Sequence, residues 1–124
     1  GGMKQPKRLG VLTQSRAYNH APVQEREAAK RLGGRTTPAS GSLREKGDVR
    51  VSGILRLECK ATSKKSFSVT RDMVRKITEA GELSGELPAI EIEFLPLAGQ
   101  FHGRVAVVPA YVLNQLVTGE KQHG

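Results

Sequence analysis

The sequence contains a single cysteine, Cys59, in 124 residues and therefore cannot form an intramolecular disulfide. Long hydrophobic runs are also missing: no apolar segment approaches the roughly 20 residues that a membrane-spanning helix needs, and none near the start resembles a signal peptide. We therefore expect a protein of a reducing compartment such as the cytoplasm, with no membrane partner. This length suits one compact domain and is too short for two.

Acidic residues are the other shortage, and the shortage is uneven along the chain. Residues 1–50 hold 11 Lys or Arg against 4 Asp or Glu, residues 51–78 hold 7 against 2, and residues 79–124 hold 2 against 6. Basic residues that only kept the protein soluble would not need this asymmetry. A polyanion such as nucleic acid is the partner that the basic part predicts. Acidic lipid is a weaker alternative, because no basic amphipathic helix supports it.

The order of expected elements indicates a single α/β domain. Residues 1–21 predict a basic, flexible arm that begins with a tag remnant, residues 22–118 the folded domain, and residues 119–124 a frayed tail. The expected helices are Pro22–Leu32, Thr70–Gly81 and Ala110–Leu116, and the expected strands are Arg35–Thr37, Gly47–Val51, Ile54–Lys60, Ser66–Val69, Pro88–Leu95 and Arg104–Val108. This order predicts a central mixed sheet flanked by helices. Two glutamates, Glu91 and Glu93, alternate with apolar residues, and we expect them to face solvent rather than to form a second metal site.

The segment Gly47–Lys60 predicts a tight β-hairpin with a two-residue turn at Ser52-Gly53. That turn would place Asp48 opposite Leu57 and make it a near neighbour of Glu58. Two carboxylates would then meet at the open end of the hairpin. Adjacent acids destabilise a fold unless a cation lies between them.

Oxygen ligands of this kind suit Mg²⁺ or Mn²⁺. On the face that carries Glu58 lies Lys60, whose ammonium can position a water or stabilise charge that develops on a phosphate. Cys59 points to the apolar face and is interpreted as a core residue. The simpler interpretation of the charged face is an exposed, salt-bridged strand.

The first helix carries one acid that its pattern turns inward. Glu25 lies on the same stripe as Ala28, Ala29 and Leu32, whereas Glu27 lies on the opposite, solvent-facing side. Two interpretations stay open: a partly exposed glutamate that the helix dipole favours, or a further acid that reaches the metal site. Glu25 is the better candidate for the second role, with Glu27 as the alternative.

The loop Pro38–Ser42 is built of small residues, which allow a phosphate to approach the backbone closely. Its serines would point the same way in an extended chain, although serine and glycine are also ordinary turn residues. The candidate nucleic-acid contacts are therefore Ser40, Ser42, Arg44, Lys46, Lys64 and Lys65.

Asp48 followed by Glu58-Cys59-Lys60 resembles the core of the PD-(D/E)XK nucleases, in which acid, any residue and lysine end a central strand. Gly47 stands where the name-giving pattern has proline. A narrower group, the archaeal-type Holliday-junction resolvases, is similar over roughly Val23–Lys60, since it also carries a Glu-Arg pair in the first helix and a P-A-S-G-S-like loop. Here the helix-to-loop distance is shorter than in that group.

The resemblance implies a restriction-endonuclease-like α/β/α core and a Mg²⁺-dependent endonuclease, with Mn²⁺ able to substitute. Asp48 and Glu58 would bind the metal with the main-chain carbonyl of Cys59, and Glu25 would bind it directly or through water. Lys60 would support the attacking water and the phosphate. Ser40 and Ser42 would hold the scissile strand.

The resemblance further implies hydrolysis that leaves a 5′-phosphate, a four-way DNA junction as substrate, a homodimer that cuts two strands, and no small-molecule cofactor. It also implies the cytoplasm of a prokaryotic, archaeal or phage-infected cell as the location. Two alternatives stay open. One is a nuclease of the same chemistry that acts on other branched, nicked or single-stranded DNA in repair or phage DNA processing. The other is a DNA-binding module without catalytic activity.

Overall fold

The computed structural model describes residues 20–37 and 48–119. The chain begins there with a helix over residues 20–32. The elements that follow are β1 (Arg35–Thr36), β2 (Asp48–Val51), β3 (Leu55–Thr62), α2 (Arg71–Ser84), β4 (Leu87–Phe94), β5 (Gly103–Val107) and α3 (Ala110–Thr118). In the described part of the chain, no helix is long and apolar enough to cross a membrane.

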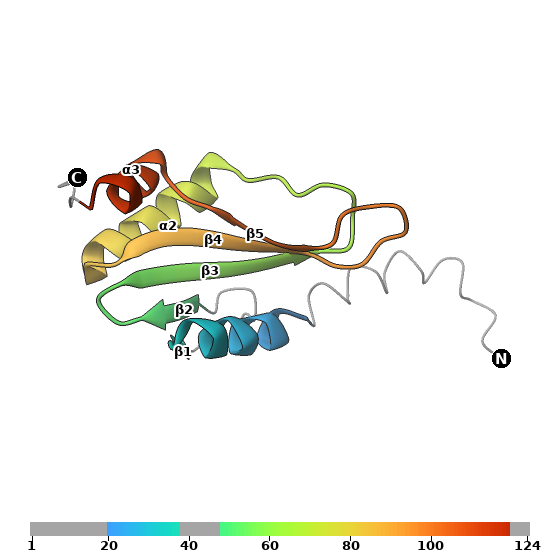
Figure 1. The fold of residues 1–124 in the computed structure, drawn as a ribbon, viewed down its shortest axis with the longest axis horizontal. Helices are drawn as coiled ribbons and strands as arrows, with labels where there is room; N and C mark the ends of the chain where they lie inside the picture. Colours follow the sequence, from blue (N-terminus) through green and yellow to red (C-terminus); the bar gives the residue numbers. More distant parts are fainter. Residues whose placement is uncertain (1–19, 38–47, 120–124) are drawn as a thin grey trace.

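The five strands form one mixed sheet in the order β1-β2-β3-β4-β5 (Figure 1). Among the described strands, β3 and β4 alone run parallel, and α2 makes the crossover between them, whereas the other neighbours are antiparallel. The expected α/β class with a mixed sheet flanked by helices is therefore confirmed. The expected strand Ser66–Val69 is wrong: these residues have no strand structure, because β3 continues to Thr62 and then leaves the sheet.

The hairpin register differs from the expected one by a residue. Val51 pairs with Leu55, so the turn contains Ser52, Gly53 and Ile54, and Gly53 adopts a positive φ of 74°. Directly paired residues share a face of the sheet. The expected register would have joined Asp48 to Leu57, a charged residue to a buried one. The observed register instead pairs Val49 with Leu57, and both are buried.

Each face of the sheet packs against a different helix. The helix over residues 20–32 places Ala28 and Ala29 against Val49, Leu57 and Cys59. On the other face, α2 packs against β4 through a cluster of Ile77, Ile90 and Ile92. Figure 1 shows the first helix, in blue, beside β1 and β2, with α2 alongside β4.

Local signals set the ends of α2 with one exception. Thr70 caps its start as expected, since its hydroxyl accepts a hydrogen bond of 3.2 Å from the Met73 N–H. The helix runs past Gly81 to Ser84 and ends on Gly85, which has a positive φ of 68°. Gly81 serves packing instead: a Cβ there would lie 2.5 Å from the Glu86 carbonyl oxygen.

Candidate active site

The hairpin brings the two expected acids into direct opposition. Asp48, the first residue of β2, pairs with Glu58 of β3, and both side chains are partly exposed on the same face. Lys60 Nζ lies 3.1 Å from Glu58 Oε2. The backbone at Asp48 is held by Thr37, whose hydroxyl accepts the Asp48 N–H at 3.1 Å. The cluster predicted from Asp48, Glu58 and Lys60 is thus formed, with closer acids than the expected register would have allowed.

An arginine that the sequence reasoning left without a role neutralises the first acid. Arg56 Nε donates a hydrogen bond of 3.2 Å to Asp48 Oδ2. Burial raises the pKa of Asp48 above its ordinary value, while the hydrogen bond and the charge of Arg56 oppose that rise. The position of Arg56 was readable, since it precedes Glu58 by two residues and so shares its face. Each acid therefore has a cation of its own in this structure.

Cys59 lies on the opposite face of the strand, as expected, and is a buried free thiol. Burial first, then the nearby carboxylates Glu91, Glu25 and Asp48, raise the pKa of its thiol far above the ordinary value. The thiol is therefore unreactive at neutral pH. Any role of Cys59 in metal binding rests on its main-chain carbonyl.

Glu25 faces the protein interior and Glu27 is exposed, as expected, whereas Leu32, expected on the same buried stripe as Glu25, is 40% exposed at the end of the helix. Glu25 is only 8% exposed, and the Oε2 atom of its carboxylate has no hydrogen-bond partner in the described residues. Burial first, and then the charge of Asp48, raise the pKa of Glu25 to about 6, with Lys60 acting in the opposite direction. An unpartnered buried carboxylate oxygen is rare in folded proteins, so Glu25 is free to accept a further hydrogen bond or ligand bond.

The structure joins Glu25 to the cluster by electrostatics rather than by contact. Its helix packs on the face of the sheet that carries Leu57 and Cys59, and no hydrogen bond or ion pair links it to Asp48, Glu58 or Lys60. Among residues 20–37 and 48–119, no group of three His, Cys, Asp or Glu side chains is arranged to hold a metal ion. Oxygen donors of the right chemistry are present, but they are not gathered into a closed site.

Glu86, a carboxylate that the sequence pattern did not single out, holds the hairpin in place. Its buried side chain accepts hydrogen bonds from Arg50 Nη2 at 2.7 Å and from the Gly53 N–H at 3.0 Å, and Arg56 Nη1 lies 3.8 Å away. These hydrogen bonds, that of Arg50 above all, lower the pKa of Glu86 to about 2 although burial opposes them. Glu86 thus ties the start of β4 to the turn between β2 and β3.

The expectation that Glu91 and Glu93 face solvent is wrong. Glu91 is buried beneath the first helix, where Arg31 Nη2 lies 2.9 Å from its Oε2 and Gln24 Nε2 donates to it. Glu93 Oε1 lies 2.9 Å from His20 Nε2. A solvent-facing strand and a strand covered by a helix have the same alternation, so periodicity alone does not distinguish them. These acids attach the first helix to β4.

The expected nucleic-acid contacts are only partly described. Lys64 and Lys65 are exposed just beyond the carboxyl end of β3. Four others lie outside the described residues: Ser40, Ser42, Arg44 and Lys46.

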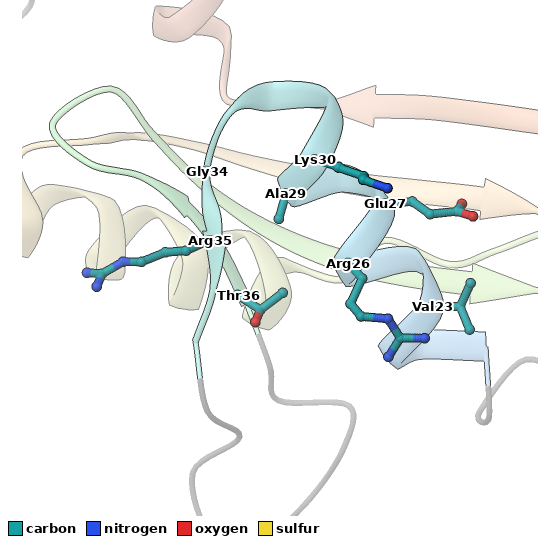
Figure 2. A pocket seen from close by; sticks show the side chains of 8 residues that line it. All are labelled: Val23, Arg26, Glu27, Ala29, Lys30, Gly34, Arg35 and Thr36. Carbon is teal, nitrogen blue, oxygen red and sulfur yellow. The ribbon is translucent and has the colours of Figure 1, made fainter.

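Figure 2 shows a further basic feature, an open groove of about 600 Å³ between the first helix and β1. Arg26 and Lys30 line it from the helix and Arg35 from the strand, against one acid, Glu27. Within the described ranges none of these three cations forms an ion pair, so the groove offers positive charge to an anion. The spacing of four residues between Arg26 and Lys30 placed them on one helix face, a signal that the sequence reasoning did not use.

Comparison with protein families, with curated proteins and with solved structures finds no match to this chain.

Proposed function

We propose that this chain is a metal-dependent endonuclease of the PD-(D/E)XK type that cuts branched DNA, with the four-way junction as its preferred substrate. The observation that carries the proposal is the direct pairing of Asp48 with Glu58, together with Lys60 on the same face, whose Nζ lies 3.1 Å from Glu58 Oε2. A purely structural strand face does not need two carboxylates in direct opposition, because the two charges repel each other and cations have to offset that repulsion.

The donor set matches a hard cation that prefers oxygen. Asp48 and Glu58 would hold Mg²⁺, or Mn²⁺ in its place, with the main-chain carbonyl of Cys59, and the unpartnered Oε2 of Glu25 would contribute directly or through a water. A bound divalent metal lowers the pKa of its water and neutralises charge on the scissile phosphate.

Lys60 and the paired acids have separate tasks in the proposed reaction. The Lys60 ammonium, held by Glu58, orients the attacking water and stabilises the extra negative charge on the phosphate oxygens. Water attacks phosphorus in line, the bond to the 3′-oxygen breaks, and that oxygen takes a proton as it leaves. The products are a 3′-hydroxyl and a 5′-phosphate.

Binding of the polyanion would use the basic surface. The groove lined by Arg26, Lys30 and Arg35, and the pair Lys64 and Lys65, carry cations without acidic partners in the described chain. Since residues 20–37 and 48–119 present no recognisable element that reads base sequence, affinity would follow DNA shape and phosphates and fall steeply with salt.

Two symmetric cuts need two sites, so we also propose a homodimer. The exposed apolar residues of α3, Leu113, Leu116 and Val117, offer a face for the second copy. We place the enzyme in the cytoplasm, where the DNA of a prokaryotic or phage-infected cell lies.

One observation favours a second candidate, a DNA-binding module without catalysis. Arg56 already neutralises Asp48 and Lys60 already neutralises Glu58, so the acid pair is balanced without a metal. A third candidate keeps the chemistry and changes the substrate to nicked or single-stranded DNA.

The test is a cleavage assay with Mg²⁺ on an immobile four-way junction, a matched linear duplex and a matched single strand. Glu58→Ala removes one acid, and Glu79→Ala, which truncates an exposed acid of α2, serves as the control. Paired cuts confined to the junction, present in the control and absent in Glu58→Ala, would support a resolvase. Cuts on the other substrates would favour the third candidate, and binding without cleavage in several divalent metals would favour the second.

A further inference from the structure

A small pocket lies where the parallel strands β3 and β4 end. Its volume is about 140 Å³, and it is lined by Lys64, Lys65, Phe94, Leu95, Leu97, Gln100 and Phe101. Pockets for drug-sized ligands are several times larger, so this one suits a single flat ring system. The carboxyl ends of parallel strands are where α/β sheets commonly bind ligands.

The aromatic wall of this pocket is both exposed and held in place. Phe101 is 65% exposed, although its ring meets the edge of Phe94 with ring centroids 6.2 Å apart and an interplanar angle of 70°. Gly103 allows the ring to fold back over the start of β5, because a Cβ at that position would lie 2.9 Å from the ring. A phenylalanine that served only to fill the core would bury more of its surface.

Positive charge lies on the rim next to this ring. Lys64 and Lys65 line the pocket, and in the part of the chain that is described neither ammonium forms an ion pair. An exposed aromatic face beside unpaired cations is the combination that binds nucleotides: the ring stacks on a base and the cations take its phosphates.

The pocket continues the candidate active site along the same strand. Lys60 and Thr62 belong to β3, Thr62 pairs with Phe94 of β4, and Lys64 follows directly. A DNA strand whose phosphate lies at Lys60 therefore has an aromatic surface within a few residues of chain, beyond the end of the sheet.

We propose that this pocket binds one unpaired nucleotide of a DNA strand. The base stacks on Phe101, and the phosphates on either side of the nucleotide contact Lys64 and Lys65. The inference rests on the proposed function in taking DNA as the ligand and in taking Lys60 as part of the cleavage site. It adds a preference: the favoured substrate carries an unpaired base close to the bond that is cut.

Phe101→Trp tests the stacking directly, because the chain has no tryptophan of its own. The probe is an oligothymidylate of twelve nucleotides, and an abasic strand of the same length serves as the comparison. Binding of each strand is followed by fluorescence anisotropy at low salt. We expect the emission of Trp at position 101 to be quenched by oligothymidylate and not by the abasic strand. Leu83→Trp is the control, since Leu83 is 90% exposed on α2 near the opposite end of β4. Its emission should not change with either strand.

Phe101→Ala supplies the affinity measurement. We expect it to weaken binding of oligothymidylate at least about fivefold and to leave binding of the abasic strand unchanged. Lys64→Ala should weaken both equally. Circular dichroism of each variant confirms that the fold is kept.

The inference is overturned if oligothymidylate binds and the tryptophan at 101 is not quenched, if Phe101→Ala weakens both strands alike, or if neither strand binds at low salt. These outcomes separate from a failure of the proposed function. If the tryptophan emission is quenched but the protein cuts no DNA, the nucleotide pocket is supported and the nuclease proposal is rejected. If the protein cuts the junction but the emission is not quenched, only the pocket proposal is rejected.

Discussion

Glu25 makes the folded protein less stable as the pH rises, and Glu25→Gln should remove this effect. The pKa of its carboxyl is raised from 4.5 to about 6 by burial and by Asp48. Between these two values the folded state binds more protons than the unfolded state. The contribution of Glu25 to stability is therefore fully present below pH 4.5 and is lost as the pH rises through 6.

The size of the effect follows from the shift. A rise of about 1.5 units corresponds to about 2 kcal/mol of unfolding free energy, lost between pH 4 and pH 7.5. For a domain of this size, that is about 10 °C in melting temperature. Glutamine at this position has no charge to bury, so Glu25→Gln should lose about 2 kcal/mol less than the wild type over the same range.

The assay is urea unfolding of both proteins at pH 4 and pH 7.5, followed by circular dichroism. The comparison uses the change between the two pH values, because titrating groups that do not interact with Glu25 then cancel between wild type and variant. Glu27→Gln is the control, since Glu27 is exposed on the same helix and should show the wild-type pH dependence. Equal pH dependence in wild type and Glu25→Gln would refute the buried, charge-coupled state of Glu25.

The same pair of proteins also tests the metal proposal without an activity measurement. A ligand that binds only the folded state raises its stability. If Glu25 contributes to the site, Mg²⁺ should raise the melting temperature of the wild type more than that of Glu25→Gln. Equal shifts would exclude Glu25 from metal binding and would leave the pH prediction intact.

Three further substitutions test the hairpin that carries the acids. Glu86→Gln should lower the unfolding free energy by about 3 kcal/mol at pH 7 in urea melts, because it leaves Arg50 beside a neutral partner. This difference from the wild type should disappear as the pH falls from 4.5 through 2, and a loss under about 1 kcal/mol at pH 7 would contradict the role of Glu86. Gly34→Ala should lower the unfolding free energy by about 2 kcal/mol or more, since the added Cβ would lie 2.3 Å from the Arg50 carbonyl oxygen. Gly33→Ala should cost less, because Gly33 has a positive φ of 73° but open space around it, and the reverse order in thermal melts would argue against this packing. Lys60→Ala should lower the rate of junction cleavage at least about hundredfold and leave junction binding nearly unchanged; cleavage at the wild-type rate would show that Lys60 does not act in the reaction.

Local sequence determined most of the elements of this fold. The Thr70 cap starts α2, and the apolar alternation of β4 predicted a strand close to its observed bounds. The helical stripe correctly turned Glu25 inward and Glu27 outward, and strand alternation correctly buried Cys59. Each of these depends on residues a few positions apart, which the backbone geometry of a helix or strand relates directly.

Tertiary structure decided what those elements meet. The burial of Val49 against Leu57 selected the register that sets Asp48 opposite Glu58. Glu86 acts on a turn more than thirty residues earlier, and Glu91 is buried because a helix far back in the chain covers it. These partners are distant in sequence, and periodicity carries no information on which face a distant element will cover. The PD-(D/E)XK assignment, the metal and the junction stay predictions, and the experiments above decide them.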